Sequence, residues 1–314
     1  MAILIAATGL AFLALPGVTR RWGKGLAPDE WGRLCGGALA VGLSMFELGA
    51  LLTAAPTVLR AAGAPTLAAA CERTLVPLLP GGAVAGWVAA AIAITVPVLA
   101  WVGLRRARRG RDAVRIEPTL GEHFSVGEHD LVVLPTERLV AVSVGGDPAQ
   151  IVVSTGLLGV LDHEQVDAVI RHEAAHLHHG HERFLLLATV VEHAAAAFPP
   201  ARRSAATLRV AIERWADEAA AGAANGCSRR SLRDALLGMT AAVVTPSSVA
   251  AFSPLDSLAE RVDALATGPR PSSALRRAAI YVPGVVLGGV AVAALGAFLG
   301  DAQTVLAMAG RCTV

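Results

Sequence analysis

The stretch His172-Glu-Ala-Ala-His176 is the most informative part of this 314-residue sequence. On a helix, His172 and His176 lie one turn apart on the same face, so both imidazoles can bind one metal ion. Glu173 lies beside them, where its carboxylate can take a proton from a water molecule on that ion. A five-residue pattern also arises by chance, and support for a metal site has to come from a second segment.

That second segment is Glu213-Arg-Trp-Ala-Asp217. Catalytic zinc usually has three protein ligands and an open fourth position, and Glu213 completes a His2Glu set with the two histidines. Asp217 lies one helical turn further and can accept a hydrogen bond from the non-ligating nitrogen of a ligand histidine. We therefore predict one Zn2+ per chain, bound by His172, His176 and Glu213, with Glu173 as the general base. The alternative is a solvated helix face with a pair of surface carboxylates.

The composition indicates a membrane protein. Hydrophobic residues make up 54% of the chain and charged residues 17%, and the mean hydropathy is +0.56. These values are too apolar for an ordinary soluble domain of this length. The net charge of +2 argues against a nucleic-acid-binding surface. Because a spanning helix needs roughly 20 apolar residues, we predict four spans, at about 2–18, 34–59, 78–104 and 278–300.

The charges between these runs predict the topology. Basic residues gather after the first run, after the third run and before the fourth, whereas the loop between the second and third holds only Arg60 and Arg73. The positive-inside rule then puts both termini outside the plasma membrane and the large middle segment in the cytoplasm. The predicted domains are 1–104 with three spans, 105–277 with the metal site, 278–300 as the fourth span and 301–314 as a short extracellular tail.

Two of the four cysteines fall on the predicted outer side, where disulfides persist. We predict that Cys71 in the outer loop pairs with Cys312 in the outer tail. Four unpaired small core residues are the alternative.

The cytoplasmic segment contains both strand and helix patterns. Its first part, 105–125, is polar and basic and is interpreted as a linker. Short runs rich in Val and Leu, separated by turn residues, predict strands at 130–134, 139–144 and 151–154. A small sheet is therefore expected before the metal-binding helix.

Capping signals set the limits of the two helices that carry the metal ligands. Asp162 and Gln165 have capping-box spacing, so the first helix is expected to begin there and to end near His179. Ser204 is predicted to cap the second helix, at 205–224.

A cluster of histidines and a short apolar segment lie at and after the end of the first of these helices. Three further histidines crowd the end of the first helix and are interpreted as a solvated polar tip: His178, His179 and His181. The apolar segment 184–198 predicts a helix too short to span, which either lies against the membrane or packs beneath the site.

Several segments resemble the membrane-embedded gluzincins, namely Ile151–Leu158, Glu164–His176 and Gly180-His181. Two branches compete: the BlaR/MecR-type antirepressor metallopeptidases of the beta-lactam response, and the HtpX-type quality-control proteases with their CaaX-processing relatives. Four spans with the protease segment between the third and fourth resemble the BlaR/MecR type, as does Glu213-Arg-Trp-Ala-Asp217-Glu218. That type carries a large extracellular penicillin-binding domain. Only a short tail follows Gly300, so direct beta-lactam sensing is not expected.

Two further elements carry the resemblance. Residues 252–262 are similar to the His-Pro…Glu-Arg-Ile stretch of the HtpX branch, although Ser253 replaces the histidine. The resemblance implies a transition-state or structural role for Arg261, with an ordinary helix-surface arginine as the alternative. The strand at 139–144 resembles the edge strand on which these enzymes align an extended peptide, with substrate contacts at Ala141, Val142 and Ser143.

The resemblance implies a mainly α integral membrane protein, with a cytoplasmic α+β gluzincin-type metalloprotease domain between transmembrane helices three and four. The expected activity is zinc-dependent cleavage of a cytoplasmic protein, above all a BlaI/MecI-like winged-helix repressor, in signal transduction for a cell-envelope or antibiotic-resistance response. The expected partners are this protein substrate, the lipid bilayer and a second copy of the chain, with no direct nucleic-acid contact. The alternatives are an HtpX-like quality-control protease and a non-enzymatic membrane receptor with a structural metal site.

Overall fold

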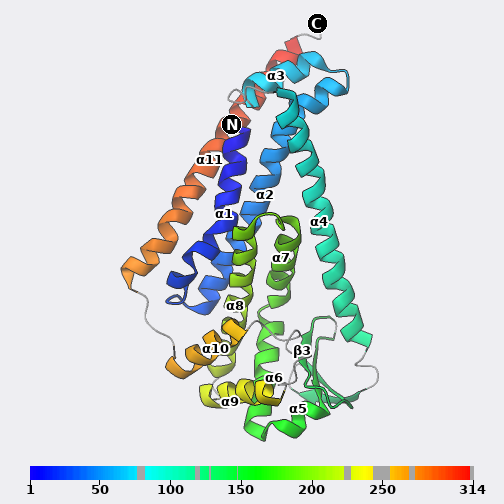
Figure 1. Ribbon diagram of the computed structural model, residues 1–314, viewed down its shortest axis with the longest axis vertical. Helices are drawn as coiled ribbons and strands as arrows, with labels where there is room; N and C mark the ends of the chain where they lie inside the picture. The colour runs from blue at the N-terminus through cyan, green and yellow to red at the C-terminus, as the bar shows by residue number, and fades with distance from the viewer. Residues whose placement is uncertain are drawn as a thin grey trace.

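The protein is a bundle of long helices with a small sheet at one end (Figure 1). The computed structural model describes residues 1–75, 82–116, 121–126, 129–146, 148–222, 228–242, 255–268 and 273–311. The start of the first helix and the end of the last described helix lie toward the end of the bundle that is opposite to the sheet (Figure 1).

Four helices are long and apolar enough to cross a membrane, as the sequence predicts. They extend beyond the predicted spans: α1 (Ala2–Gly23), α2 (Pro28–Ala61), α4 (Gly82–Ile116) and α11 (Ala274–Arg311). The short α3 (Pro65–Leu75) follows α2. The predicted linker at 105–125 is wrong in its first half, because α4 continues through Ile116. Arginine is a good helix former, so the basic run does not end the helix.

Helices α1 and α2 pack with their backbones close together, because glycines lie at the contact. A Cβ atom added at Gly9 would lie 2.4 Å from the backbone nitrogen of Phe46, and one at Gly42 would lie 2.8 Å from that of Leu13. Small residues allow this close approach in membrane helix pairs. The α1–α2 pair therefore tolerates no larger side chain at these two positions without moving apart.

The sheet has four strands in the order β1-β2-β4-β3. The strands are β1 (Glu122–Val126), β2 (His129–Leu134), β3 (Ala141–Val144) and β4 (Gln150–Ser154). Strands β2 and β4 are parallel and the other pairs are antiparallel. The three predicted strands are confirmed, and β3 lies at an edge, where it pairs with β4 alone among the described strands. Strand β1 was missed, because its short polar sequence is stabilised by pairing with β2.

Among the described residues, six helices lie between α4 and α11. They are α5 (Thr155–Val160), α6 (His163–His178), α7 (His181–Ala194), α8 (Pro199–Gly222), α9 (Arg229–Ala242) and α10 (Leu255–Thr267). The predicted capping box is present at the start of α6: Asp162 accepts from the Gln165 backbone, and the Gln165 side chain accepts from the Asp162 backbone. Gly180 has a φ of +60°, which suits glycine and turns the chain sharply into α7.

Ser204 does not cap a helix, contrary to the prediction. Helix α8 begins earlier, at Pro199, because proline is favoured in a first helical turn. The buried Ser204 hydroxyl instead accepts a 2.9 Å hydrogen bond from the backbone N–H of Gly17. Pro16 interrupts the hydrogen bonding of α1 at this point. The bond thus links α8 directly to the first membrane-span candidate.

Helices α7 and α8 form a hairpin that is inserted among α1, α2 and α4 (Figure 1). Leu13 and Leu39 of the long helices pack with Val191 of α7 and with Leu208 and Ile212 of α8 in one buried cluster. The predicted short helix at 184–198 thus corresponds to α7, and it packs inside the molecule. This shared core fixes the domain that contains the sheet to the membrane-span candidates.

Cys71 lies half-buried on α3, and Cys312 lies outside the described residues. The disulfide between them therefore stays a prediction.

Candidate metal centre

The predicted ligands come together where α6 and α8 pack against each other. His172 and His176 lie one turn apart on α6, and Glu213 reaches them from α8. The Nε2 atoms of the two histidines are 3.2 Å apart. Glu213 places Oε2 3.5 Å from His172 Nε2 and Oε1 3.7 Å from His176 Nε2. Three potential ligand atoms thus surround one point.

These separations fit a tetrahedral zinc ion. Zinc binds imidazole nitrogen at about 2.0–2.1 Å and carboxylate oxygen at about 2.0–2.2 Å, so tetrahedral ligand atoms lie about 3.3–3.6 Å from one another. The distance between the two Nε2 atoms and the distance from His172 Nε2 to Glu213 Oε2 are close to this range, and the second Glu213 oxygen, Oε1, lies 3.7 Å from His176 Nε2. Two imidazoles and one carboxylate are also the donor set of a catalytic zinc site with an open position.

A buried ion-pair network supports this site from α10. Arg261 donates two hydrogen bonds to Asp217, from Nε to Oδ2 at 2.8 Å and from Nη2 to Oδ1 at 2.7 Å. Its Nη1 lies 2.9 Å from Glu213 Oε2. Asp217 Oδ1 in turn lies 3.0 Å from His172 Nδ1, the nitrogen that faces away from the other ligands. Arg261 is buried, so it is not an ordinary surface arginine.

The network keeps its acidic groups ionised. Burial acts to raise the pKa of Glu213, but Arg261 and His172 hold it well below its usual range. Asp217 behaves in the same way, since the charge and hydrogen bonds of Arg261 outweigh burial and lower its pKa. Burial acts to lower the pKa of His172, but hydrogen bonds with Asp217 and Glu213 raise it to about 9. Metal binding must therefore displace a proton from His172 at neutral pH.

Glu173 is half-buried on α6, one residue after the first ligand. Burial lowers the pKa of His176, and the nearby charge of Glu173 acts in the opposite direction. Glu173 thus lies close enough to His176 for their charges to interact, and its role as general base stays a prediction.

His181 is a member of the site that the sequence interpretation missed. It was expected in a solvated polar tip, but it is completely buried. Its Nδ1 lies 3.1 Å from Nδ1 of His176, and its ring packs against Trp215 with a centroid distance of 4.6 Å. The turn at Gly180 brings the first residue of α7 back against α6. The sequence signals of this arrangement are the glycine after the motif and the resemblance that Gly180-His181 carries.

The predicted substrate strand lies beside the metal-binding helix. Strand β3, with Ala141, Val142 and Ser143, packs against α6, and its outer edge is unpaired among the described strands (Figure 1). Ser253, the position where a histidine was expected from the resemblance, lies outside the described residues.

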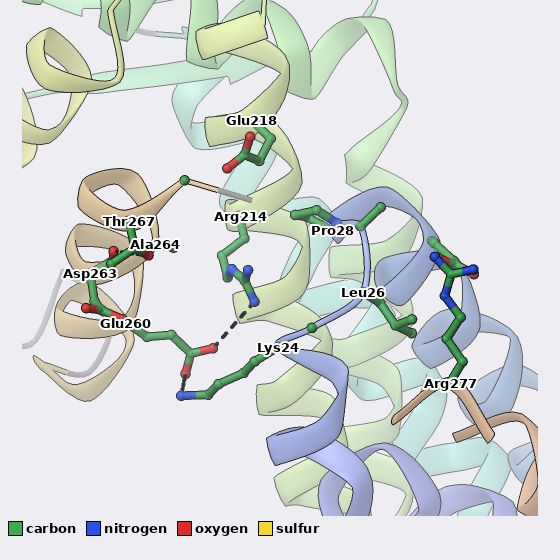
Figure 2. A pocket seen from close by; sticks show the side chains of 14 residues that line it. Lys24, Leu26, Pro28, Arg214, Glu218, Glu260, Asp263, Ala264, Thr267 and Arg277 are labelled. Atoms are coloured by element: carbon green, nitrogen blue, oxygen red, sulfur yellow. Dashed lines mark hydrogen bonds and ion pairs between the residues drawn. The ribbon is translucent and has the colours of Figure 1, made fainter. Parts of the chain in front are cut away.

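A separate cavity lies between α8, α10, the start of α11 and the loop after α1 (Figure 2). It has a volume of about 410 Å³, and none of the metal-ligand candidates lines it. Glu260 reaches into it and pairs with Lys24 at 3.2 Å and, outside the cavity, with Arg20 at 2.8 Å. Because Glu260 precedes Arg261, α10 contacts the end of α1 and the metal centre through consecutive residues.

Comparison with known proteins identifies the region that contains the site. Residues 141–266 match the model of a family described as Peptidase family M48, whose members are metalloproteases that typically bind zinc. The match runs from β3 through α10 and includes all three ligand candidates, Glu173, Asp217, His181 and Arg261. A search of curated proteins and a search of solved structures found no match. Residues 141–266 are thus similar to the M48 peptidases, and the described part of the chain has four candidate membrane spans.

Proposed function

We propose that this protein is a membrane-embedded zinc endopeptidase of the gluzincin type. The observation that carries the proposal is the M48-matching segment in which His172, His176 and Glu213 each place a potential ligand atom within 4.8 Å of the others, which is the His2Glu donor set of a catalytic zinc site. The position of this site at the end of a bundle of four candidate spans supports a membrane-tethered enzyme.

The chain's own residues would divide the catalytic work as follows. His172, His176 and Glu213 hold the zinc ion, which when bound supplies a Lewis acid and lowers the pKa of a water molecule. The Glu173 carboxylate accepts the proton from the attacking water and delivers it to the nitrogen of the leaving amine. Asp217 and Arg261 orient His172 and keep Glu213 ionised, so that the ligand set is ready for a divalent cation.

Strand β3 would align the substrate. An extended peptide can add to an unpaired sheet edge through main-chain hydrogen bonds, a form of β-augmentation. The edge of β3 adjoins α6, so a peptide bound there would run close to the metal centre. Main-chain recognition of this kind accepts many sequences, and the accessible segments of the substrate would then decide where it is cut.

The protease domain would face the cytoplasm, with both termini outside. The basic residues Arg20 and Lys24, in the last turn of α1 and just after it, pair with Glu260 of the M48-matching segment and so lie at the same end of the molecule as the metal centre. Basic loops are retained on the cytoplasmic side of a membrane. Cysteine accessibility at Arg33 and at Arg73, which lie at opposite ends of α2–α3, would test this orientation in intact cells.

The proposed substrate is a BlaI/MecI-like winged-helix repressor, so that cleavage relays a cell-envelope signal to transcription. A second candidate is an HtpX-like role in degrading damaged membrane proteins, which the open edge of β3 favours because it imposes little sequence selection. The two differ in substrate breadth. Proteome comparison of wild-type and Glu173→Ala strains separates them, since one accumulating repressor supports signalling and many accumulating membrane proteins support quality control.

A direct test of the enzyme uses purified protein in detergent micelles. We expect wild type with zinc to cleave an unfolded model protein such as casein, and Glu173→Gln to bind zinc without cleaving it. Asp167→Asn serves as a control, because Asp167 lies on the same helix in a half-exposed pair with Arg171. Bound zinc without cleavage in wild type would favour the non-enzymatic receptor.

A further inference from the structure

We infer that His181 is a positioning residue for the metal site: its Nδ1 accepts a hydrogen bond from Nδ1–H of His176 and thereby fixes that ligand ring with Nε2 toward the metal. This inference rests on the proposed zinc site and adds to it a residue that is not itself a ligand. The two Nδ1 atoms are 3.1 Å apart.

The direction of the hydrogen bond follows from the chemistry of the ligand. A neutral histidine that binds a metal through Nε2 carries its proton on Nδ1. Nδ1 of His176 is therefore the donor, and Nδ1 of His181 must be the acceptor. His181 then carries its single proton on Nε2.

The surroundings of His181 argue against packing as its only role. Its Nε2 is buried and finds no hydrogen-bond partner among the described residues. A buried donor without an acceptor is costly, so packing against Trp215 alone would favour an apolar ring at this position. The free-energy cost of the unpaired Nε2 is explained if the Nδ1 atom of the same ring is needed to accept the hydrogen bond from His176. His172 has the corresponding support, since Asp217 lies 3.0 Å from its Nδ1.

Two substitutions separate the hydrogen bond from the ring. His181→Phe keeps an aromatic ring against Trp215 but removes the acceptor. His181→Asn removes the ring but places Oδ1 close to the position of Nδ1. His179→Phe is the matched control, because His179 stacks on His181 and contacts Trp215 but lies outside the ligand set. Thermal unfolding of each metal-free protein confirms that the variants are folded.

The measurements are zinc affinity, by competition with a chromophoric chelator, and the visible absorption spectrum of the Co2+-substituted full-length protein. We expect His181→Phe to weaken zinc binding about 10-fold or more and to alter the Co2+ spectrum, while His181→Asn and His179→Phe stay close to wild type. Wild-type affinity in His181→Phe would overturn the inference, as would an equal loss in His181→Asn. A wild type that binds no zinc would instead overturn the proposed function, and this inference with it.

Discussion

The two ligand histidines of α6 are supported in opposite ways. His172 is backed by Asp217 of α8, which forms a charged pair with Arg261 of α10. His176 is backed by the neutral ring of His181, which is packed against Trp215. The charged support of His172 depends on α10, which is distant in sequence and also contacts α1. The neutral support of His176 depends on the turn at Gly180, only four residues away. Zinc affinity should therefore respond to changes in α10 through His172, and to changes in local packing through His176.

The largest expected effect is the loss of Arg261. Arg261→Met leaves Glu213 and Asp217 buried without their cation, which should lower the free energy of unfolding of the metal-free protein by about 3–5 kcal/mol. Zinc should reduce this loss, because it supplies positive charge to the same carboxylates. Chemical unfolding with and without zinc measures both values. Arg209→Met is the control, since the Arg209–Glu192 pair is half-exposed and should contribute about 1 kcal/mol or less. A similar loss in both variants would contradict the account.

The next effect is the pH dependence of the stability of the metal-free protein. His172 and His181 should change this stability in opposite directions as the pH rises. The pKa of His172 is raised from 6.5 to about 9, so its contribution is complete below pH 6.5 and is lost as the pH rises through 9. This loss is on the order of 3 kcal/mol. The pKa of His181 is lowered from 6.5 to about 3 by burial, so stability falls as the pH drops below 6.5.

Unfolding measured between pH 5 and pH 9.5 should therefore show a maximum near pH 6.5. Asp217→Asn should flatten the alkaline decline, and His181→Phe should flatten the acidic one. A profile that each variant leaves unchanged would contradict this assignment.

Replacing Asp217 and replacing His181 should also change zinc affinity by different amounts. We expect zinc affinity to fall about 100-fold in Asp217→Asn and about 10-fold in His181→Phe. These values span the usual range for replacing a hydrogen-bond partner of a metal-binding histidine. The carboxylate is the stronger acceptor and also holds Arg261 in place. Chelator competition at pH 7.5 compares both variants with Asp167→Asn. A larger loss in His181→Phe than in Asp217→Asn would mean that His181 contributes more to zinc affinity than Asp217 does.

The smallest expected effect concerns the contact between α10 and α1. Glu260→Gln removes the charge that pairs with Arg20 and Lys24, both of which are substantially exposed. We expect a loss of stability of about 1 kcal/mol or less, which high salt should mask. Glu72→Gln is the matched control, because Glu72 pairs with Arg60 at the other end of α2. A large fall in zinc affinity in Glu260→Gln would show that the contact of Glu260 with α1 is tightly coupled to the contact of Arg261 with the metal site.

Local patterns predicted the ligands, and distant contacts account for what was missed. The spacing of His172 and His176 and the capping box at Asp162 act within one or two turns, so the sequence alone was enough to place them. The burial of His181 depends on the turn at Gly180 and on Trp215 from another helix. Strand β1 depends on pairing with β2 in the same way. Features that exist only through such contacts leave little signal in a single sequence.

The most direct test of the central claim is the zinc content of the purified protein, measured by mass spectrometry together with cleavage of casein. The account predicts one zinc per chain in wild type and in Glu173→Gln, cleavage by wild type alone, and loss of zinc in Glu213→Ala. Full zinc content in Glu213→Ala, or cleavage by Glu173→Gln, would contradict the assignment of these residues to the metal site and its chemistry.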